Sequence, residues 1–259
     1  MNDLYSGAIG QTIQILPGER IYLPDILDLK GKNIKAIDYC DALATSPEGN
    51  AIMADGAGLY LNLMKAGTKN LFVKDFPLTD LAVSRTKGQR VKINEIIDLI
   101  NSFIYNPTNK TGYIYLVFWF DEPKISNVYQ TSEQSNYESF EVVRKSENSN
   151  IIPFDENRTL YAKQVRNLFL SISGGSVTPS GRIIAGTVYY TKMFITLQLN
   201  NYKYIRQVPL YLFNQISNYE PIRLQNVVFD FNNSYLELAK NETLEAGVAF
   251  LISEEYKRN

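Results

Sequence analysis

The sequence predicts an all-β protein of two tandem β-sandwich domains with at most short helices. Two observations predict it: sequence blocks recur in the same order in both halves, and strand-like patterns alternate with turn residues throughout each half. Composition agrees, since 45% of the residues are hydrophobic and 20% are charged, as is usual for a chain that buries a core.

The repeat is clearest at a separation of 132 positions. Phe72-Val73-Lys74 recurs as Tyr204-Ile205-Arg206, and Phe76-Pro77-Leu78 recurs as Val208-Pro209-Leu210. Further pairs keep the same separation: Asn94 and Asn226, Asp98 and Asp230, Asn101 and Asn233, Ser102 and Ser234, Phe103 and Tyr235. Several collinear blocks at one separation indicate an internal duplication.

Other blocks match at slightly different separations, as turns that gain or lose residues would cause. They are residues 112–117 with 247–252, residues 60–64 with 194–198, Lys32-Asn33-Ile34 with Arg166-Asn167-Leu168, and, more weakly, Ile15-Leu16-Pro17 with Ile151-Ile152-Pro153. The order of all these blocks is the same in both halves.

The blocks place a first domain at residues 1–124 and a second at residues 151–259. Residues 125–150 are rich in Ser, Asn, Glu, Gln and Lys, which predicts a polar linker with room for one strand at residues 139–144. Each half has about 110–130 residues, the size of an eight-stranded jelly roll or an immunoglobulin-like sandwich.

Strand patterns are found in both halves. Residues 12–15 alternate polar and apolar side chains, and residues 113–120 form the continuous apolar run of a buried strand. Residues 168–173 and 187–199 are also rich in strand-forming residues.

One repeated segment has a pattern that fits two structures. The isoleucines of residues 93–100 have helical spacing, as do the apolar residues of 224–231. The second copy is rich in β-branched and aromatic residues, which favours a strand, so helix and strand both stay open.

Composition excludes several classes of function. The chain has no histidine, which removes the usual base near neutral pH, the Ser-His-Asp and Cys-His arrangements, and the commonest ligand of transition metals. Cys40 is the lone cysteine and is interpreted as a small core residue. The net charge of −1, without a basic stripe, gives no footprint for nucleic acid. No apolar run is long enough for a membrane helix, and residues 1–11 lack the pattern of a secretory signal.

Each candidate for chemistry has a structural interpretation that we favour. Asp55-Gly56-Ala57-Gly58 lacks the spacing of a phosphate loop and predicts a plain turn. Asp25 and Asp28 could hold a hard cation but are interpreted as solvated turn residues. The repeated Asp98 and Asp230 are interpreted as fixing turns through their Asn and Ser neighbours.

The aromatic residues and glycosylation motifs are interpreted in the same way. Trp119 could belong to a sugar-binding platform, but its place in an apolar run favours the core or a subunit contact. Tyrosines 189, 190, 202 and 204 could stack on bases, but no basic groove accompanies them and strand pairing is favoured. The Asn-x-Ser/Thr motifs begin at Asn109, Asn157, Asn232 and Asn241, and they are interpreted as incidental. We therefore assign no catalytic, cofactor-binding or metal-binding residue.

The duplicated blocks resemble the double jelly-roll major capsid proteins of small icosahedral, membrane-containing bacteriophages, namely the corticovirus type and the single-stranded-DNA phages of Flavobacterium. They comprise residues 60–78 with 90–120 and residues 194–210 with 223–256. The resemblance is architectural and covers most of the chain. It implies two upright eight-stranded jelly rolls per chain and a homotrimer that forms a pseudo-hexagonal capsomer of an icosahedral shell.

The same resemblance implies a structural protein of the virion, assembled in the host cytoplasm, with no enzymatic activity and no cofactor. The implied partners are further copies of the chain, penton or other minor capsid proteins and an internal membrane, with no sequence-specific contact to nucleic acid.

Two other classes of function remain open on the sequence. A phage decoration or head-fibre module with lectin-like domains would need an exposed aromatic cluster. A carboxylate-dependent glycosidase would need two acidic residues facing each other in a cleft, and no such pair stands out.

Overall fold

The computed structural model describes residues 4–5, 7–82, 90–121, 135–143, 149–154, 164–171, 190–199, 202–213, 223–228, 230, 232–242 and 248–256. Within these residues the protein is all-β, as the sequence predicts. The strands are β1 (Leu4–Tyr5), β2 (Gly7–Ile15), β3 (Arg20–Tyr22), β4 (Asn33–Tyr39), β5 (Tyr60–Lys65), β6 (Leu71–Pro77), β7 (Lys92–Tyr105), β8 (Gly112–Asp121), β9 (Ser135–Val143), β10 (Ile151–Pro153), β11 (Gln164–Ser171), β12 (Met193–Leu199), β13 (Tyr202–Pro209), β14 (Arg223–Val228), β15 (Tyr235–Leu238) and β16 (Val248–Tyr256). Between them lie short 3-10 turns: η1 (Leu27–Leu29), η2 (Leu78–Leu81) and η4 (Leu210–Phe213).

The first half has the strand order of a jelly roll. Strand β7 is long enough to pair with β4 through its first part and with β5 and β3 through its last part, so it contributes to both layers. One layer has the order β2-β8-β4-β7, and the other has the order β3-β7-β5-β6. With β7 counted as the sixth and seventh strands, these orders are 1-8-3-6 and 2-7-4-5, which define an eight-stranded jelly roll.

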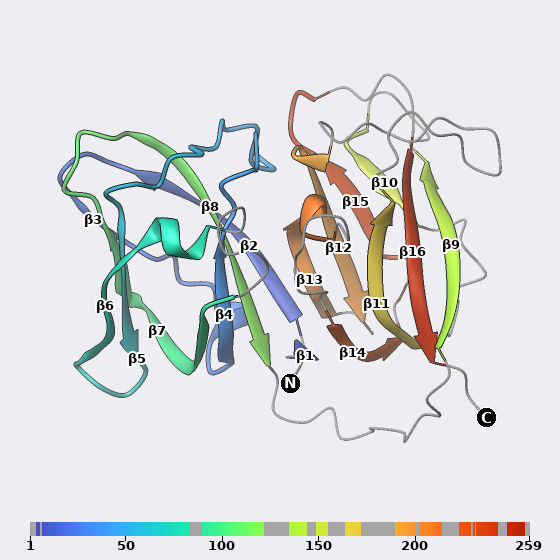
Figure 1. Ribbon diagram of the computed structural model, residues 1–259, viewed down its shortest axis with the longest axis horizontal. Helices are drawn as coiled ribbons and strands as arrows, with labels where there is room; N and C mark the ends of the chain where they lie inside the picture. Colours follow the sequence, from blue (N-terminus) through green and yellow to red (C-terminus); the bar gives the residue numbers. More distant parts are fainter. Residues whose placement is uncertain are drawn as a thin grey trace.

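The second half repeats this order. One layer is β9-β16-β11-β14, and β1 adds a parallel strand beside β14. The other layer is β10-β15-β12-β13, so β14 and β15 together correspond to the single strand β7. In Figure 1 the strands of the first half lie on the left and those of the second half on the right.

The pairing registers of the two halves also correspond. Tyr60 pairs with Pro77 across β5 and β6, and Phe194 pairs with Pro209 across β12 and β13. The other three pairs between β5 and β6 also have equivalents between β12 and β13, with the same differences in residue number. Strands β4 and β11 each carry a bulge against the neighbouring strand, at Lys35 and at Arg166. The two halves therefore match in strand pairing as well as in amino-acid sequence.

Residues 93–100 lie within β7, and residues 224–228 of the matching segment lie within β14, so the helical alternative is wrong. Along β7 the exposed Ile96 is followed by the buried Ile97, and the buried Leu99 is followed by the exposed Ile100. Side chains along β7 thus alternate between the buried and the exposed face, which is the periodicity of a strand. The β-branched isoleucines favour a strand as well.

Two of the proposed block matches are wrong in detail. Arg20 on β3 pairs with Tyr105, and Ile151 on β10 pairs with Glu237, which is the repeat position of Tyr105. The counterpart of β10 is therefore β3, and not residues 15–17. The bulges likewise align Lys35 with Arg166, three positions away from the match proposed from sequence. Such short segments carry too few side chains to fix an alignment without their pairing partners.

The segment predicted as a polar linker contains β9 at Ser135–Val143, which covers most of the strand expected at residues 139–144. This strand pairs with β16 over its whole length and is part of the smaller sheet. The division of the chain into domains at residues 124 and 150 remains a prediction.

The two halves meet where β2 pairs in parallel with β13. We call this strand pair, together with the buried core that contains Trp119, the joint. Ala8 pairs with Ile205 and Ile9 with Arg206, so the sheets of the two halves are continuous. Alternate residues of β8 face two different cores: Phe118 lies in the interior of the first half, whereas Trp119 packs with residues of the second half. Burial on both faces explains the continuous apolar run at residues 113–120.

Candidate functional site

The joint holds a buried charged group on its β8 side. Asp38 of β4 is 3% exposed and accepts hydrogen bonds from Nε1 of Trp119 (2.7 Å) and from Nε of Arg90 (2.9 Å). The Arg90 guanidinium lies 5.0 Å from the centre of the Trp119 ring. Burying a carboxylate is costly unless opposite charge and donors surround it, and here both do. The group is enclosed, so it fixes β4, β8 and the start of β7 relative to one another.

A second contact of the joint depends on a glycine. The hydroxyl of Tyr115 on β8 donates to the backbone oxygen of Gln207 on β13, at 2.6 Å. A side chain at Gly10 on β2 would bring a Cβ to 2.2 Å from that same oxygen. Gln207 adopts a positive φ of 51°, as Asp75 does at the matching place on β6. Burial raises the pKa of the Tyr115 hydroxyl well above its usual range, so it remains a donor.

Cys40 is fully buried in the same core, which confirms the prediction of a core residue. Burial raises the pKa of its thiol well above the usual value, and the carboxylate of Asp38 adds to this shift. Tyr211, which is 8% exposed, lies in the same core. A neutral, enclosed thiol is not a nucleophile.

The two aspartates considered for a cation have different surroundings. Asp25 is exposed, and Asp28 accepts a hydrogen bond from the guanidinium of Arg206 on β13, which lies in the other half. Groups of three or more Asp, Glu, Cys or His that could hold a metal are absent from the described residues. Asp28 therefore serves as an ion-pair partner across the joint.

Asp98 and Asp230 anchor the chain through the same hydrogen bonds in both halves. Asp230 precedes a turn at residues 232–233, as predicted, whereas Asp98 lies within β7, so the turn predicted there is wrong. Ser102 Oγ donates to the backbone oxygen of Asp98 (2.7 Å) and accepts from the backbone N–H of Met64 (2.9 Å). Ser234 Oγ donates to Asp230 (2.7 Å) and accepts from the N–H of Gln198 (3.0 Å). Each hydroxyl thus replaces a ladder hydrogen bond where the strand passes from one layer to the other.

The side chains of these two aspartates are occupied as well. Asp98 Oδ2 accepts from the side-chain amide of Asn101 at 2.8 Å, and Asp230 Oδ2 accepts from that of Asn233 at 2.7 Å. Both pairs are exposed, and neither aspartate faces a second carboxylate in these contacts. The repeated Asp-Asn-Ser pattern therefore has a structural role in both halves, although only the second copy lies at a turn.

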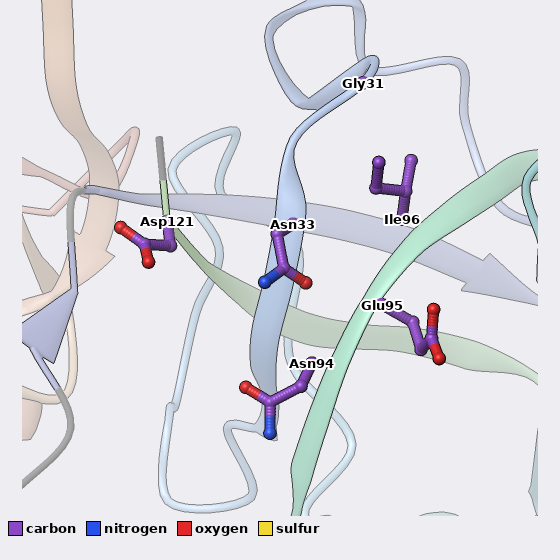
Figure 2. A pocket seen from close by; sticks show the side chains of 6 residues that line it. All are labelled: Gly31, Asn33, Asn94, Glu95, Ile96 and Asp121. Carbon is purple, nitrogen blue, oxygen red and sulfur yellow. The ribbon is translucent and has the colours of Figure 1, made fainter. Parts of the chain in front are cut away.

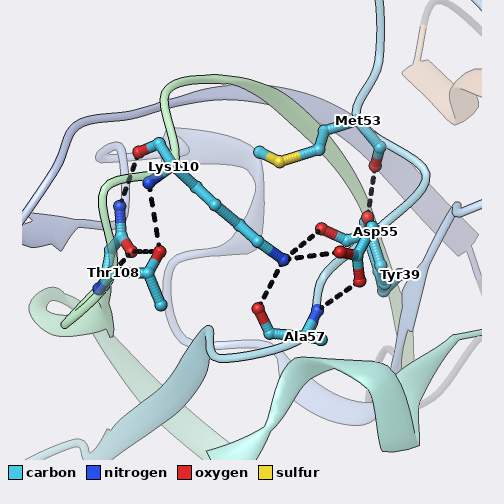
Figure 3. Close-up of polar contacts among 7 residues, drawn as sticks. Tyr39, Met53, Asp55, Ala57, Thr108 and Lys110 are labelled. Atoms are coloured by element: carbon cyan, nitrogen blue, oxygen red, sulfur yellow. Dashed lines mark hydrogen bonds and ion pairs between the residues drawn. The ribbon is translucent and has the colours of Figure 1, made fainter.

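The glycine-rich segment is a turn before β5, also as predicted. Asp55 Oδ1 accepts from the N–H of Ala57 at 2.9 Å, and Gly58 has a φ of 78°. Figure 3 shows the Lys110 ammonium held by Asp55 and Ala57, at 2.8 Å from Asp55 Oδ2 and 2.6 Å from the Ala57 oxygen. The nearby lysine closes the turn.

One solvent-open hollow of about 360 Å³ lies where β4, β7 and the end of β8 meet (Figure 2). It is lined by Gly31, Asn33, Asn94, Glu95, Ile96 and Asp121. Each of its carboxylates has a lysine partner: Glu95 lies 2.8 Å from Lys65, and Asp121 lies 3.5 Å from Lys35. Both carboxylates that line the hollow are therefore engaged in ion pairs.

The aromatic candidates are structural within the described residues. Trp119 is fully buried, so it is a core residue and not an exposed sugar platform. Tyr190 is 2% exposed. Residues 202 and 204 lie in β13, which agrees with the prediction that they belong to a paired strand. Residues 189 and 157 lie outside the described part of the chain. A helix long and apolar enough to cross a membrane is not found among the residues that the structure describes.

Sequence patterns provide little sign of the joint. Arg90 is notable in the sequence only because Arg223 stands at the start of the matching segment. Asp38 and Gly10 belong to no sequence motif or repeated block. Their partners lie far away in the chain: Arg90 is 52 positions from Asp38, and Trp119 is 81 positions from it.

No protein-family model matches the chain, and no match to a curated protein is found. Among solved structures, the chain is similar to the one described as "Crystal structure of the major capsid protein P2 from Bacteriophage PM2". The sequences are 9% identical, the match covers 97% of this chain and 99% of that chain, and the TM-score is 0.20. That TM-score is too low to support an argument, so any function proposed for this chain depends on its own geometry.

Proposed function

We propose that the chain is a structural shell protein without enzymatic activity, whose trimers form the pseudo-hexagonal capsomers of a bacteriophage capsid. One observation carries the proposal: both halves have the same strand order and registers, and they lie side by side through the parallel pairing of β2 with β13. A trimer of such chains has six similar outer faces. Six similar faces let identical trimers meet one another in nearly equivalent ways across a flat facet.

The proposal includes two tandem jelly-roll domains. The first ends near residue 124, and the second takes in β9, because that strand completes the layer formed with β16 and β11. Contacts with minor capsid proteins, with an internal membrane and with neighbouring trimers belong to the same proposal, as does a location in the virion.

The use of the buried polar groups supports this proposal. Asp38, Ser102 and Ser234 are all buried, and their hydrogen bonds run to other parts of the same chain. A protein whose work lies in its outer surfaces needs a rigid interior of this kind. The alternative of a lectin-like binding module loses its tryptophan platform, since Trp119 is in the core.

The test is the mass and assembly of the purified protein. Size-exclusion chromatography with light scattering should give a trimer near three times 29.5 kDa, and electron microscopy should show flat or curved sheets at high concentration. A protein that stays monomeric at every concentration and forms no ordered assembly would overturn the proposal.

A further inference from the structure

The joint within one chain is a template for a joint between chains. It pairs β13, the fifth strand of the second jelly-roll order, with β2, the first strand of the first. By the repeat, β6 is the counterpart of β13 and β9 is the counterpart of β2. Strands β6 and β9 therefore have the same backbone N–H and C=O groups with which β13 and β2 pair inside the chain.

Both counterparts lie at sheet ends. Among the strands that the structure describes, β6 ends the larger sheet and β9 ends the smaller one. Figure 1 shows them in different halves, with β6 in the left half and β9 at the right edge of the other. An edge strand presents backbone N–H and C=O groups that can pair with a strand of another chain.

We propose that β6 of one chain pairs in parallel with β9 of a second copy, so that each interface in the trimer repeats the joint inside the chain. This inference rests on the proposed function and adds the surface, the partner strand and the register. Ala8–Ile205 and Ile9–Arg206 transfer by the repeat to Tyr137–Val73 and Glu138–Lys74.

The residue types at this register are complementary. Lys74 is exposed on β6, and a glutamate stands at the position opposite it on β9. Within the chain, the corresponding Arg206 is also an ion-pair donor, to Asp28. A cross-strand pair of opposite charge favours this register over slipped ones.

The contact is head-to-tail, because β6 and β9 are different surfaces. Head-to-tail contacts close into a ring only if each step turns by the right angle, and otherwise they extend into a filament. With two domains in each chain, a ring of three chains alternates joints within and between chains, six in all.

The two kinds of joint differ in closeness. Gly10 and Tyr115, which allow the tight approach to Gln207, are matched by Ser139 and Phe250 in the other half. A serine carries the Cβ that Gly10 lacks, and phenylalanine has no hydroxyl to donate. The joint between chains is therefore wider and weaker than the one inside the chain, as suits a contact that forms during assembly.

Cysteines at the two paired positions test the register directly. The Lys74→Cys, Glu138→Cys double variant should form disulfides between chains under mild oxidation, because neighbouring strands lie about 4.7–4.9 Å apart, within the about 4.4–6.8 Å between Cα atoms that a disulfide spans. Denaturing gels without reductant should show covalent dimers and trimers. The matched control is Lys69→Cys with Glu138→Cys: it moves one thiol along to the turn before β6, and it should give little cross-linking.

Charge reversal gives a second measurement without a disulfide. Lys74→Glu should raise the concentration at which half of the chains are trimeric by up to about tenfold, because the ring loses three such cross-strand pairs, and adding Glu138→Lys should restore it. Circular dichroism of each variant shows whether the fold is kept.

The outcomes separate the two proposals. Trimers that cross-link at 74 and 138, but not at 69 and 138, support the register. Trimers without cross-linking at 74 and 138, and with no response to charge reversal, overturn it while leaving the shell function in place. A wild-type protein that is monomeric throughout overturns both.

Discussion

Replacing Ser102 or Ser234 with alanine should destabilise the protein by about 1–3 kcal/mol, and by nearly equal amounts for the two sites. Each hydroxyl is buried, at 0% and 1% exposure, and makes two hydrogen bonds to the backbone. Alanine would leave a part-buried N–H, that of Met64 or Gln198, and a carbonyl without this partner. Because the four distances span only 2.7–3.0 Å, the two halves should respond alike.

Urea unfolding followed by far-ultraviolet circular dichroism measures both losses, and the fluorescence of the buried Trp119 reports on the joint. Asn101→Ala and Asn233→Ala are matched controls, since their exposed hydrogen bonds to the neighbouring aspartates should change stability by about 0.5 kcal/mol or less. A loss in one half only would contradict the view that both hydroxyls replace the same ladder bond. So would losses no larger than those of the controls.

Four further predictions address the joint. Gly10→Ala should cost about 1–3 kcal/mol in thermal unfolding, because its Cβ would lie 2.2 Å from the Gln207 oxygen, and a neutral result would mean that the strands sit further apart. Asp38→Ala should cost about 3–5 kcal/mol by leaving a buried guanidinium without its carboxylate, and a loss below that of a surface variant would argue against the buried group. The Cys40 thiol should stay unreactive to a disulfide reagent at pH 8 until urea is added, since burial raises its pKa, and rapid labelling of the folded protein would disprove its enclosure. Burial raises the pKa of Tyr190 from 10.0 to about 12, so its contribution to stability should be intact below pH 10 and lost between pH 10 and 12, where the unfolded chain ionises first; a flat unfolding midpoint over that range would refute this.

Local patterns were sufficient to predict strands. The apolar run at residues 113–120 predicts a buried strand, and β8 occupies it. The blocks separated by 132 positions predict a duplicated unit. Strand β6 pairs with β5 in the same register in which β13 pairs with β12. Both signals are local: side chains alternate along a strand, and a duplicated gene segment keeps its order.

Pairing partners were needed for the rest. Residues 93–100 fit a helix by spacing until their exposure alternates on β7. Arg20-Ile21-Tyr22 and Ile151-Ile152-Pro153 share one identical residue, and their equivalence appears only in the strands they pair with. Strand β9 looked like a linker because polar side chains dominate it, yet its backbone completes a sheet.

The sequence by itself determined the all-β class, the repeated blocks and the lack of histidine chemistry, because those depend on residue types and on order along the chain. Only the tertiary structure decided that β2 lies beside β13, that Asp38 meets Arg90 and Trp119, and that Gly10 leaves room for the Gln207 carbonyl. These contacts join residues far apart in the chain, and they arise from how two sandwiches pack, which leaves no periodic trace in either segment.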